Sequence, residues 1–265
     1  IEQLAEEKIC EVLRPIYEDK RDFAHLVQVL ERQYGFAQGP LAFELAVRIA
    51  EIYEDELSRY DLALAFYGKA FLAQSGIALL REFTLAAEMA EDFESFVLIG
   101  EEKLGQELSN EERIDLLFAL AQAAGGQLKD TAGAKGRYEA IVALDAANER
   151  AIDALIALAR SLNDQVLLCQ WLEAKRTTRG EKSVRREAAL EVAELCFKSL
   201  NDAPRAVAVL MAQLEEREND PPVFARLDEI LTATDDHAGL VALCERRLKF
   251  EREDAEILPL KIRIA

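Results

Sequence analysis

One register runs through the whole sequence and limits what the chain can fold into. An aspartate that precedes a helix-like segment recurs with spacings of 70, 72 and 72 residues, and an alanine series recurs with spacings of 71, 72 and 72. The two series are Asp22, Asp92, Asp164 and Asp236, and Ala50, Ala121, Ala193 and Ala265. Because the two series share one period, we predict an array of structural repeats that stack to bury a continuous core.

The long repeat divides into two unlike parts. The tetrapeptide Ser161-Leu-Asn-Asp164 recurs at Ser199-Leu-Asn-Asp202, 38 residues further on, which leaves 72 − 38 = 34 residues for the other part. We therefore predict one continuous solenoid over residues 1–265. Its units are residues 5–76, 77–148, 149–220 and a truncated 221–265. Ala265 falls within a helical pattern and Ile1 is not a methionine, so we expect the sequence to be an excerpt of a longer array.

The composition and periodicity favour helices throughout. Hydrophobic residues make up 51% of the chain, while glycine (12) and proline (6) are scarce. In one clear example, Ile152, Leu155, Ile156 and Ala159 follow the spacing of a helix face, and the Asn163-Asp164 turn follows them. We predict an all-α chain with about fifteen helices and no β-sheet. Small residues let helices approach closely at Ala63, Ala134 and Ala206.

Charge and cysteine content restrict the partners and the compartment. The net charge is -18, which disfavours nucleic acid and anionic lipid as partners. No apolar run approaches the length of about 20 residues that spans a bilayer. We interpret the four cysteines as buried small apolar residues in a reducing, cytoplasmic compartment, although an even number leaves disulfides open. They are Cys10, Cys169, Cys196 and Cys244.

The segment from Ala134 to Asp145, AKGRYEAIVALD, resembles the second helix of a tetratricopeptide repeat (TPR). Residues 148–155 resemble the first helix of the next repeat, and similar phrases recur at 60–70 and 203–214. The chain departs from the family because the usual tryptophan and glycine are mostly missing, and Ala147 stands where a proline closes a repeat. The resemblance implies a right-handed α-α superhelix of helical hairpins that holds a protein or peptide on a concave surface.

The resemblance also implies that the first helix of each hairpin lines the binding surface. By register, we expect its exposed positions to be Glu11, Glu18, Glu44, Glu51, Glu54, Arg81, Glu88, Asp115, Gln122, Asp153, Arg160, Glu187, Glu194 and Glu229. Eleven of the 13 charged residues in this set are acidic. We therefore predict a basic partner, against the alternative that these side chains only form a solvated helix face. Arg81 and Arg160 alone do not make the family's clamp for a carboxyl terminus.

The sequence offers few residues for chemistry. The histidines are His25 and His237, and Asp235-Asp236-His237 is interpreted as a helix cap rather than a metal site. Adjacent carboxylates such as Glu111-Glu112 point about 100° apart on a helix, so they do not converge on one substrate atom. We predict an interaction scaffold with no catalytic residue, cofactor or metal. The alternatives are a regulatory subunit that wraps or completes an enzyme or larger assembly, and an enzyme whose site the sequence does not reveal.

Overall fold

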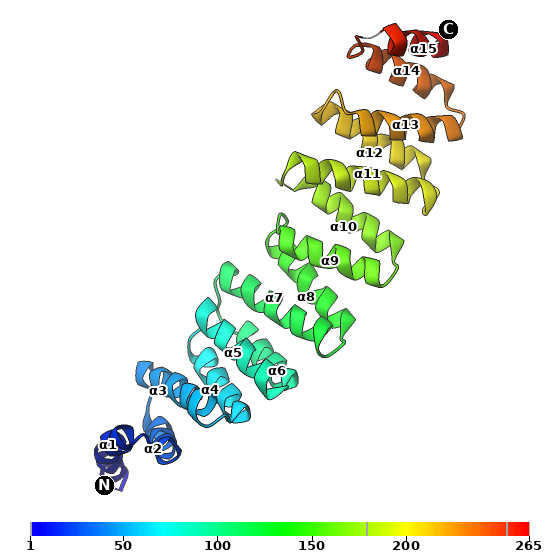
Figure 1. Cartoon of the computed structure of the whole chain (residues 1–265). Helices are drawn as coiled ribbons and strands as arrows, with labels where there is room; N and C mark the ends of the chain where they lie inside the picture. Colours follow the sequence, from blue (N-terminus) through cyan, green and yellow to red (C-terminus); the bar gives the residue numbers. More distant parts are fainter. Residues whose placement is uncertain (1, 179, 253, 265) are drawn as a thin grey trace. The chain divides into compact units, whose positions relative to one another are not determined.

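The computed structural model describes residues 2–178, 180–252 and 254–264. The chain separates into two compact units, residues 1–144 and 145–265. In the described part of unit 1, consecutive helices pack as antiparallel pairs (Figure 1). The helices of unit 1 are α1 (Glu2–Lys20), α2 (Phe23–Phe36), α3 (Pro40–Glu51), the π-helical turn η1 (Ile52–Glu56), α4 (Tyr60–Ala73), α5 (Ile77–Ala90), α6 (Phe93–Leu104), α7 (Asn110–Gly126) and α8 (Thr131–Leu144).

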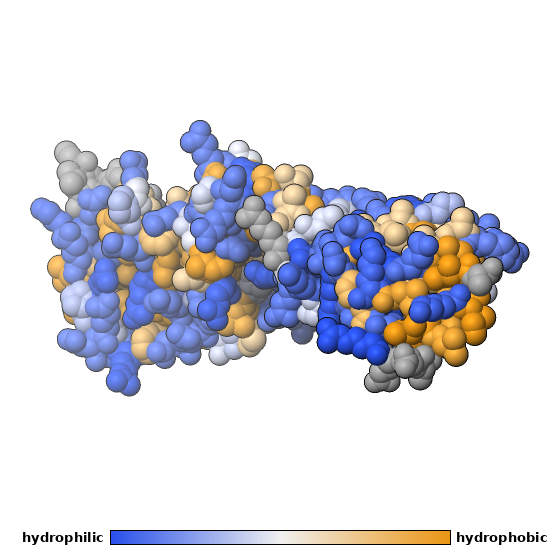
Figure 2. Space-filling view, turned by 90° about the horizontal axis from the view of Figure 1, so that it is seen from above, coloured by the Kyte–Doolittle hydropathy of each residue, from blue (hydrophilic) through white to orange (hydrophobic). Residues whose placement is uncertain are grey.

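Unit 2 repeats the same arrangement. Its helices are α9 (Glu149–Ser161), α10 (Gln165–Thr177), α11 (Lys182–Lys198), α12 (Ala203–Glu216), α13 (Pro221–Ala233), α14 (His237–Leu248) and α15 (Asp254–Ile264). The fifteen α-helices and the absence of strands in the described residues confirm the predicted all-α class. Leu258 and Ile262 of α15 are exposed. Figure 2 shows a hydrophobic area at its right. The prediction of one continuous solenoid stays a prediction.

The aspartates of the sequence register begin helices. In α2, α6, α10 and α14 the aspartate side chain accepts a hydrogen bond from the backbone N–H three residues later, as an N-cap does. Each aspartate follows a residue with positive φ, and its own N–H bonds to the carbonyl five residues earlier. The positive-φ residues are Arg21, Glu91, Asn163 and Asp235. A left-handed turn followed at once by a helix cap therefore reverses the chain within two residues.

A second kind of turn alternates with the first. At Arg59, Asp130 and Asp202 the N–H bonds to the carbonyl six residues earlier, so these turns hold one more residue. The residue before each of them, Ser58, Lys129 and Asn201, again has positive φ. The turns at Asp130 and Asp202 lie within the hairpins α7–α8 and α11–α12, while the tighter turns at Asp92 and Asp164 lie within α5–α6 and α9–α10. Hairpins with two turn geometries therefore alternate along the chain.

Small side chains set the helix spacing, as the sequence suggested. Ala63, Ala134 and Ala206 are all buried. Glycine permits a still closer approach between α6 and α7, because a Cβ atom built on Gly100 would lie 2.5 Å from a methyl group of Leu120. Gly126 is the last residue of α7.

The residues with possible chemistry have structural roles. All four cysteines are buried, as predicted, and they are free. Trp171 is also buried. His25 and His237 are exposed, and each follows an N-cap aspartate at the start of a helix. Burial raises the pKa of the Cys10 and Cys244 thiols, so neither is prepared for nucleophilic chemistry.

Candidate functional site

We call the first helices of the hairpins the A helices: α1, α3, α5 and α7 in unit 1, and α9, α11, α13 and α15 in unit 2. The predicted site residues lie on these helices, except Glu54, which lies on η1. The exposed members are Glu11, Glu18, Glu44, Arg81, Glu88, Gln122, Asp153, Arg160, Glu187 and Glu229, and the half-buried members are Glu51, Glu54, Asp115 and Glu194. Whether they bind a partner stays a prediction.

In unit 2, most of the predicted site residues form ion pairs or hydrogen bonds with other residues of the unit. Arg160 of α9 donates to Glu191 of α11 at 2.7 Å, and Arg226 of α13 lies 2.9 Å from Glu194 of α11. Arg226 also pairs with Glu229, and Lys175 of α10 donates to Asp153 at 2.5 Å. The cations of neighbouring helices thus offset much of the negative charge on this face, and the pairs tie α9, α11 and α13 together.

The A helices of unit 1 differ in this respect. Glu44, Glu88, Glu111 and Asp115 make no ion pair or hydrogen bond through their carboxylates within the described part of the chain. Three other predicted residues do have partners there. Glu18 on α1 accepts from Arg14 at 3.0 Å. Glu51 accepts from Arg48 at 3.1 Å, and Glu54 accepts from the Tyr67 hydroxyl at 2.9 Å, which together with burial raises the pKa of Tyr67. Uncompensated negative charge is therefore concentrated on α3, α5 and α7.

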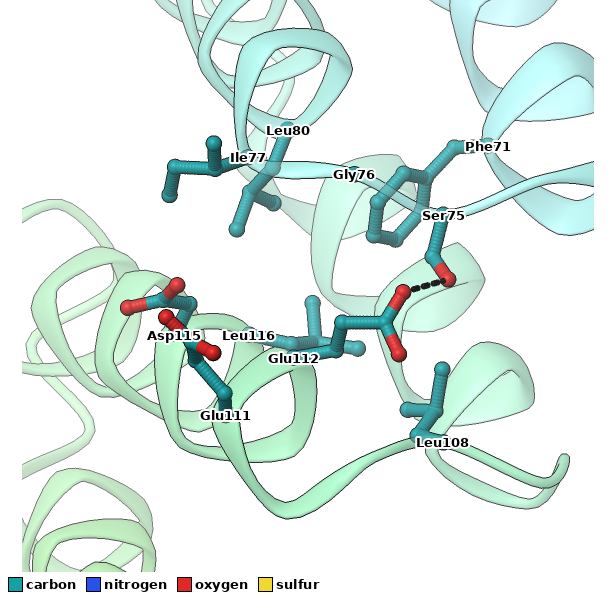
Figure 3. A pocket seen from close by; sticks show the side chains of 10 residues that line it. All are labelled: Phe71, Ser75, Gly76, Ile77, Leu80, Leu108, Glu111, Glu112, Asp115 and Leu116. Carbon is teal, nitrogen blue, oxygen red and sulfur yellow. Dashed lines mark hydrogen bonds between the residues drawn. The ribbon is translucent and has the colours of Figure 1, made fainter.

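A pocket of about 150 Å³ lies between the first turns of α5 and α7 (Figure 3). Its apolar walls come from α4, α5, α7 and the segment before α7: Phe71, Ile77, Leu80, Leu108 and Leu116. Its polar groups belong to Ser75, Glu111, Glu112 and Asp115. Figure 3 shows the Glu111 and Asp115 carboxylates together at one end of the pocket, and these residues are one helical turn apart on α7. The pocket thus combines apolar walls with a negatively charged end.

Glu112 has a structural role in this pocket. Its carboxylate accepts hydrogen bonds from the Ser75 hydroxyl at 2.6 Å and from the Ser109 hydroxyl at 2.7 Å, and it closes a capping box at the start of α7. These bonds stabilise the charged form and lower the pKa of Glu112 to about 2. Glu112 therefore fixes the loop before α5 against α7 and holds the pocket open in one geometry.

A buried lysine lies behind the pocket wall. The Lys103 ammonium donates to the Leu72 carbonyl and to the Gln106 side chain, both at 3.0 Å, and it lies 5.8 Å from the centre of the Phe71 ring. Burial lowers the pKa of Lys103, and the nearby Glu112 opposes that shift. Lys103 and Glu112 offset each other, so Glu111 and Asp115 remain as the free charges of the pocket.

A second hollow lies at the other end of the same two helices. It is open to solvent and is lined by Glu88, Glu91, Asp92, Phe93, Glu94, Gln127 and Leu128. Glu88 belongs to the predicted set, as Asp115 does in the first pocket. Each end of the α5–α7 pair therefore has an acidic hollow.

The sequence prediction missed several residues of the pocket. Asp115 was predicted, but Ser75, Ile77, Glu111 and Glu112 were not. A local signal for Glu112 does exist, because Ser109-Asn-Glu-Glu112 has the spacing of a capping box. Within the described residues, no group of three or more His, Cys, Asp or Glu could hold a metal ion, and no helix has the length and apolar character to cross a bilayer.

The chain matches no model of a known protein family and no curated protein. Among solved structures it is similar to a tetratricopeptide repeat protein from Parabacteroides merdae, with 15% identity, 98% of this chain and 100% of that chain covered, and a TM-score of 0.39. It is also similar to a chain of the Naa15/Naa10 structure bound to HypK-THB, with 15% identity, 98% and 39% coverage, and a TM-score of 0.47.

A third similar structure is the TPR2AB domain of yeast Sti1 in complex with pHSP90, with 13% identity, 85% and 99% coverage, and a TM-score of 0.32. Because these TM-scores are all below 0.5, we assign the fold from the helix pairing within each unit. That pairing is a series of consecutive antiparallel hairpins with small residues at the helix contacts. The chain therefore has a tetratricopeptide-like fold.

Proposed function

We propose that this chain is a protein-interaction scaffold without catalytic activity, and that unit 1 binds a basic segment of a protein partner on the A helices α3, α5 and α7. One observation carries the proposal: four carboxylates on this face lack cationic partners within the described residues, whereas most predicted carboxylates of unit 2 are paired. The four belong to Glu44, Glu88, Glu111 and Asp115. An unpaired group of like charges raises the energy of the free protein, and a basic partner relieves it.

The size of the effect depends on how far the partner excludes water. Two unit charges 4 Å apart interact by about 1 kcal/mol in water and about 4 kcal/mol at the effective dielectric of a protein surface. The exposed carboxylates of Glu44 and Glu88 therefore act mainly by steering the approach of the partner. The partly buried Asp115, beside apolar walls, contributes more to the bound state. Binding should weaken as salt increases.

Site-specific photocrosslinking tests this assignment without knowledge of the partner. A photoreactive phenylalanine is placed at Ile77, which is exposed at the mouth of the pocket on α5, or at Leu98, which is 72% exposed on the second-helix side, on α6. Each purified variant is irradiated in an extract of the source cells at low and at high salt. We expect a discrete protein adduct from position 77 and much less from position 98, and we expect the adduct at 77 to weaken in high salt.

The opposite pattern would exclude the proposal. Equal adducts from both positions, or a stronger adduct from position 98, would place the partner elsewhere. If salt leaves the adduct from position 77 unchanged, the chain would still be an interaction scaffold, but a basic partner segment would be excluded. Mass spectrometry of the adduct identifies the protein and the crosslinked segment, whose net charge is then read directly.

A further inference from the structure

We propose that the pocket between α5 and α7 takes one basic side chain, a lysine or an arginine of the partner, as an anchor. This inference rests on the proposed function for the identity of the partner as a protein, but the pocket's preference for a cation with an aliphatic stem stands on its own geometry. The side chain would lie along Phe71, Leu80 and Leu116, with its charged end between Glu111 and Asp115.

The apolar walls match the methylene stem of such a side chain. Phe71, Leu80 and Leu116 line the pocket and are at most 5% exposed. Ile77, at the mouth, is 57% exposed. Lysine and arginine place their stems on apolar surface and keep their charged ends close to solvent or to an anion. An occupant with such a stem would cover Ile77 and fill a volume of about 150 Å³.

The charged end selects a cation because its two free carboxylates have no partner among the residues that the structure describes. Glu111 and Asp115 are four residues apart on α7, so their side chains are neighbours on the helix surface and repel each other. Glu112 does not compete for the ligand, because Ser75 and Ser109 already bond to its oxygens. A cation between Glu111 and Asp115 would remove the repulsion and gain charge-assisted hydrogen bonds.

Other occupants fit less well. A metal ion needs more oxygen ligands than two carboxylates beside apolar walls provide. An anionic group would be repelled by Glu111 and Asp115, and a neutral apolar group would leave their repulsion in place. The pocket is therefore expected to discriminate by charge at constant stem length.

Small probes test this preference directly on the whole chain. The protein is labelled at Ile and Leu methyl groups and titrated with n-butylammonium, n-butylguanidinium, n-butanol or butyrate at constant ionic strength. We expect both cations to shift the methyl signals of Ile77, Leu80 and Leu116 saturably, n-butanol to bind at least three-fold more weakly, and butyrate to have no saturable effect.

Two double variants separate a local effect from the general charge of the chain. Glu111→Gln with Asp115→Asn removes the free charges of the pocket, and Glu102→Gln with Glu107→Gln removes the same net charge from exposed positions outside it. We expect the first variant to weaken n-butylammonium binding at least five-fold and the second less than two-fold. Unshifted pocket methyl signals, equal affinity for n-butanol, or equal effects of both variants would overturn the proposal.

The probe experiment and the crosslinking experiment fail independently. Cation binding in the pocket without an adduct at position 77 would retain the anchor site and exclude the proposed partner surface. An adduct at position 77 without cation binding in the pocket would retain the surface and exclude the anchor.

Discussion

Phe83 of α5 is the residue whose removal should do most damage near the pocket. It is fully buried, and its ring packs against Phe71 of α4 with centroids 5.6 Å apart and against Phe96 of α6 at 4.8 Å. A buried aromatic side chain removes about 150–250 Å² from water, which at about 25 cal/mol/Å² corresponds to an upper bound of about 4–6 kcal/mol. We therefore expect Phe83→Ala to lower the free energy of unfolding by about 3–5 kcal/mol.

A second substitution at Phe83 separates ring contacts from apolar burial. Phe83→Leu keeps most of the apolar volume but loses two aromatic contacts, each worth about 0.5–1.5 kcal/mol. We expect it to cost about 1–3 kcal/mol, clearly less than Phe83→Ala. If the two substitutions had equal effects, or if Phe83→Ala cost less than about 1 kcal/mol, the packing described here would be wrong.

Native-state hydrogen exchange is the assay that locates the effect. Repeat arrays lose stability unit by unit, since each helix contacts mainly its neighbours. The loss of protection should therefore be largest in α4, α5 and α6, whose rings meet at Phe83. A greater loss of protection in α13 and α14 than in these three helices would exclude this local effect, because the ring contacts of Phe83 are with α4 and α6.

Two further predictions concern the helix contacts and the pocket frame. Gly100→Ala should destabilise the chain by about 1–3 kcal/mol in urea unfolding, because its Cβ would lie 2.5 Å from Leu120. Gly136→Ala has nothing near its Cβ and should stabilise the chain by about 0.5–1 kcal/mol. Equal effects of the two substitutions would contradict the close approach of α6 and α7. Because the pKa of Glu112 is lowered to about 2, its contribution to stability is present above about pH 4.5 and is lost as the pH falls toward 2. Glu112→Gln should therefore flatten the acid side of a plot of unfolding free energy against pH, and Ser75→Ala should flatten it less. An unchanged plot would contradict a stabilising role for the hydrogen bonds of Glu112.

The sequence predicted those features of the fold that are encoded locally. The aspartate register was predictive because each aspartate caps a helix through a bond to its own chain three residues later, as Asp92 does. The alanines of the register were informative because their small size is itself the packing requirement.

The ion pairs and the pocket were not predicted, because they depend on contacts across hairpins. Arg160 and Glu191 are 31 residues apart, and Ser75 and Glu112 are 37 apart. These separations are close to the length of one hairpin, so the two residues of each pair occupy similar positions in successive hairpins. Side-chain geometry decides the rest: the capping-box spacing marks Glu112 as a partner of Ser109, but the sequence does not show that Ser75 is its second partner.

The charge preference of the A-helix face can be measured by selecting peptides from an unbiased random library against the immobilised chain. If the A-helix face of unit 1 recognises a basic segment, the selected peptides should be enriched in lysine and arginine relative to the input library. The enrichment should disappear when the target carries Glu111→Gln with Asp115→Asn, and it should persist with Glu102→Gln and Glu107→Gln. Peptides no more basic than the library, or a basic enrichment that survives loss of Glu111 and Asp115, would contradict the account.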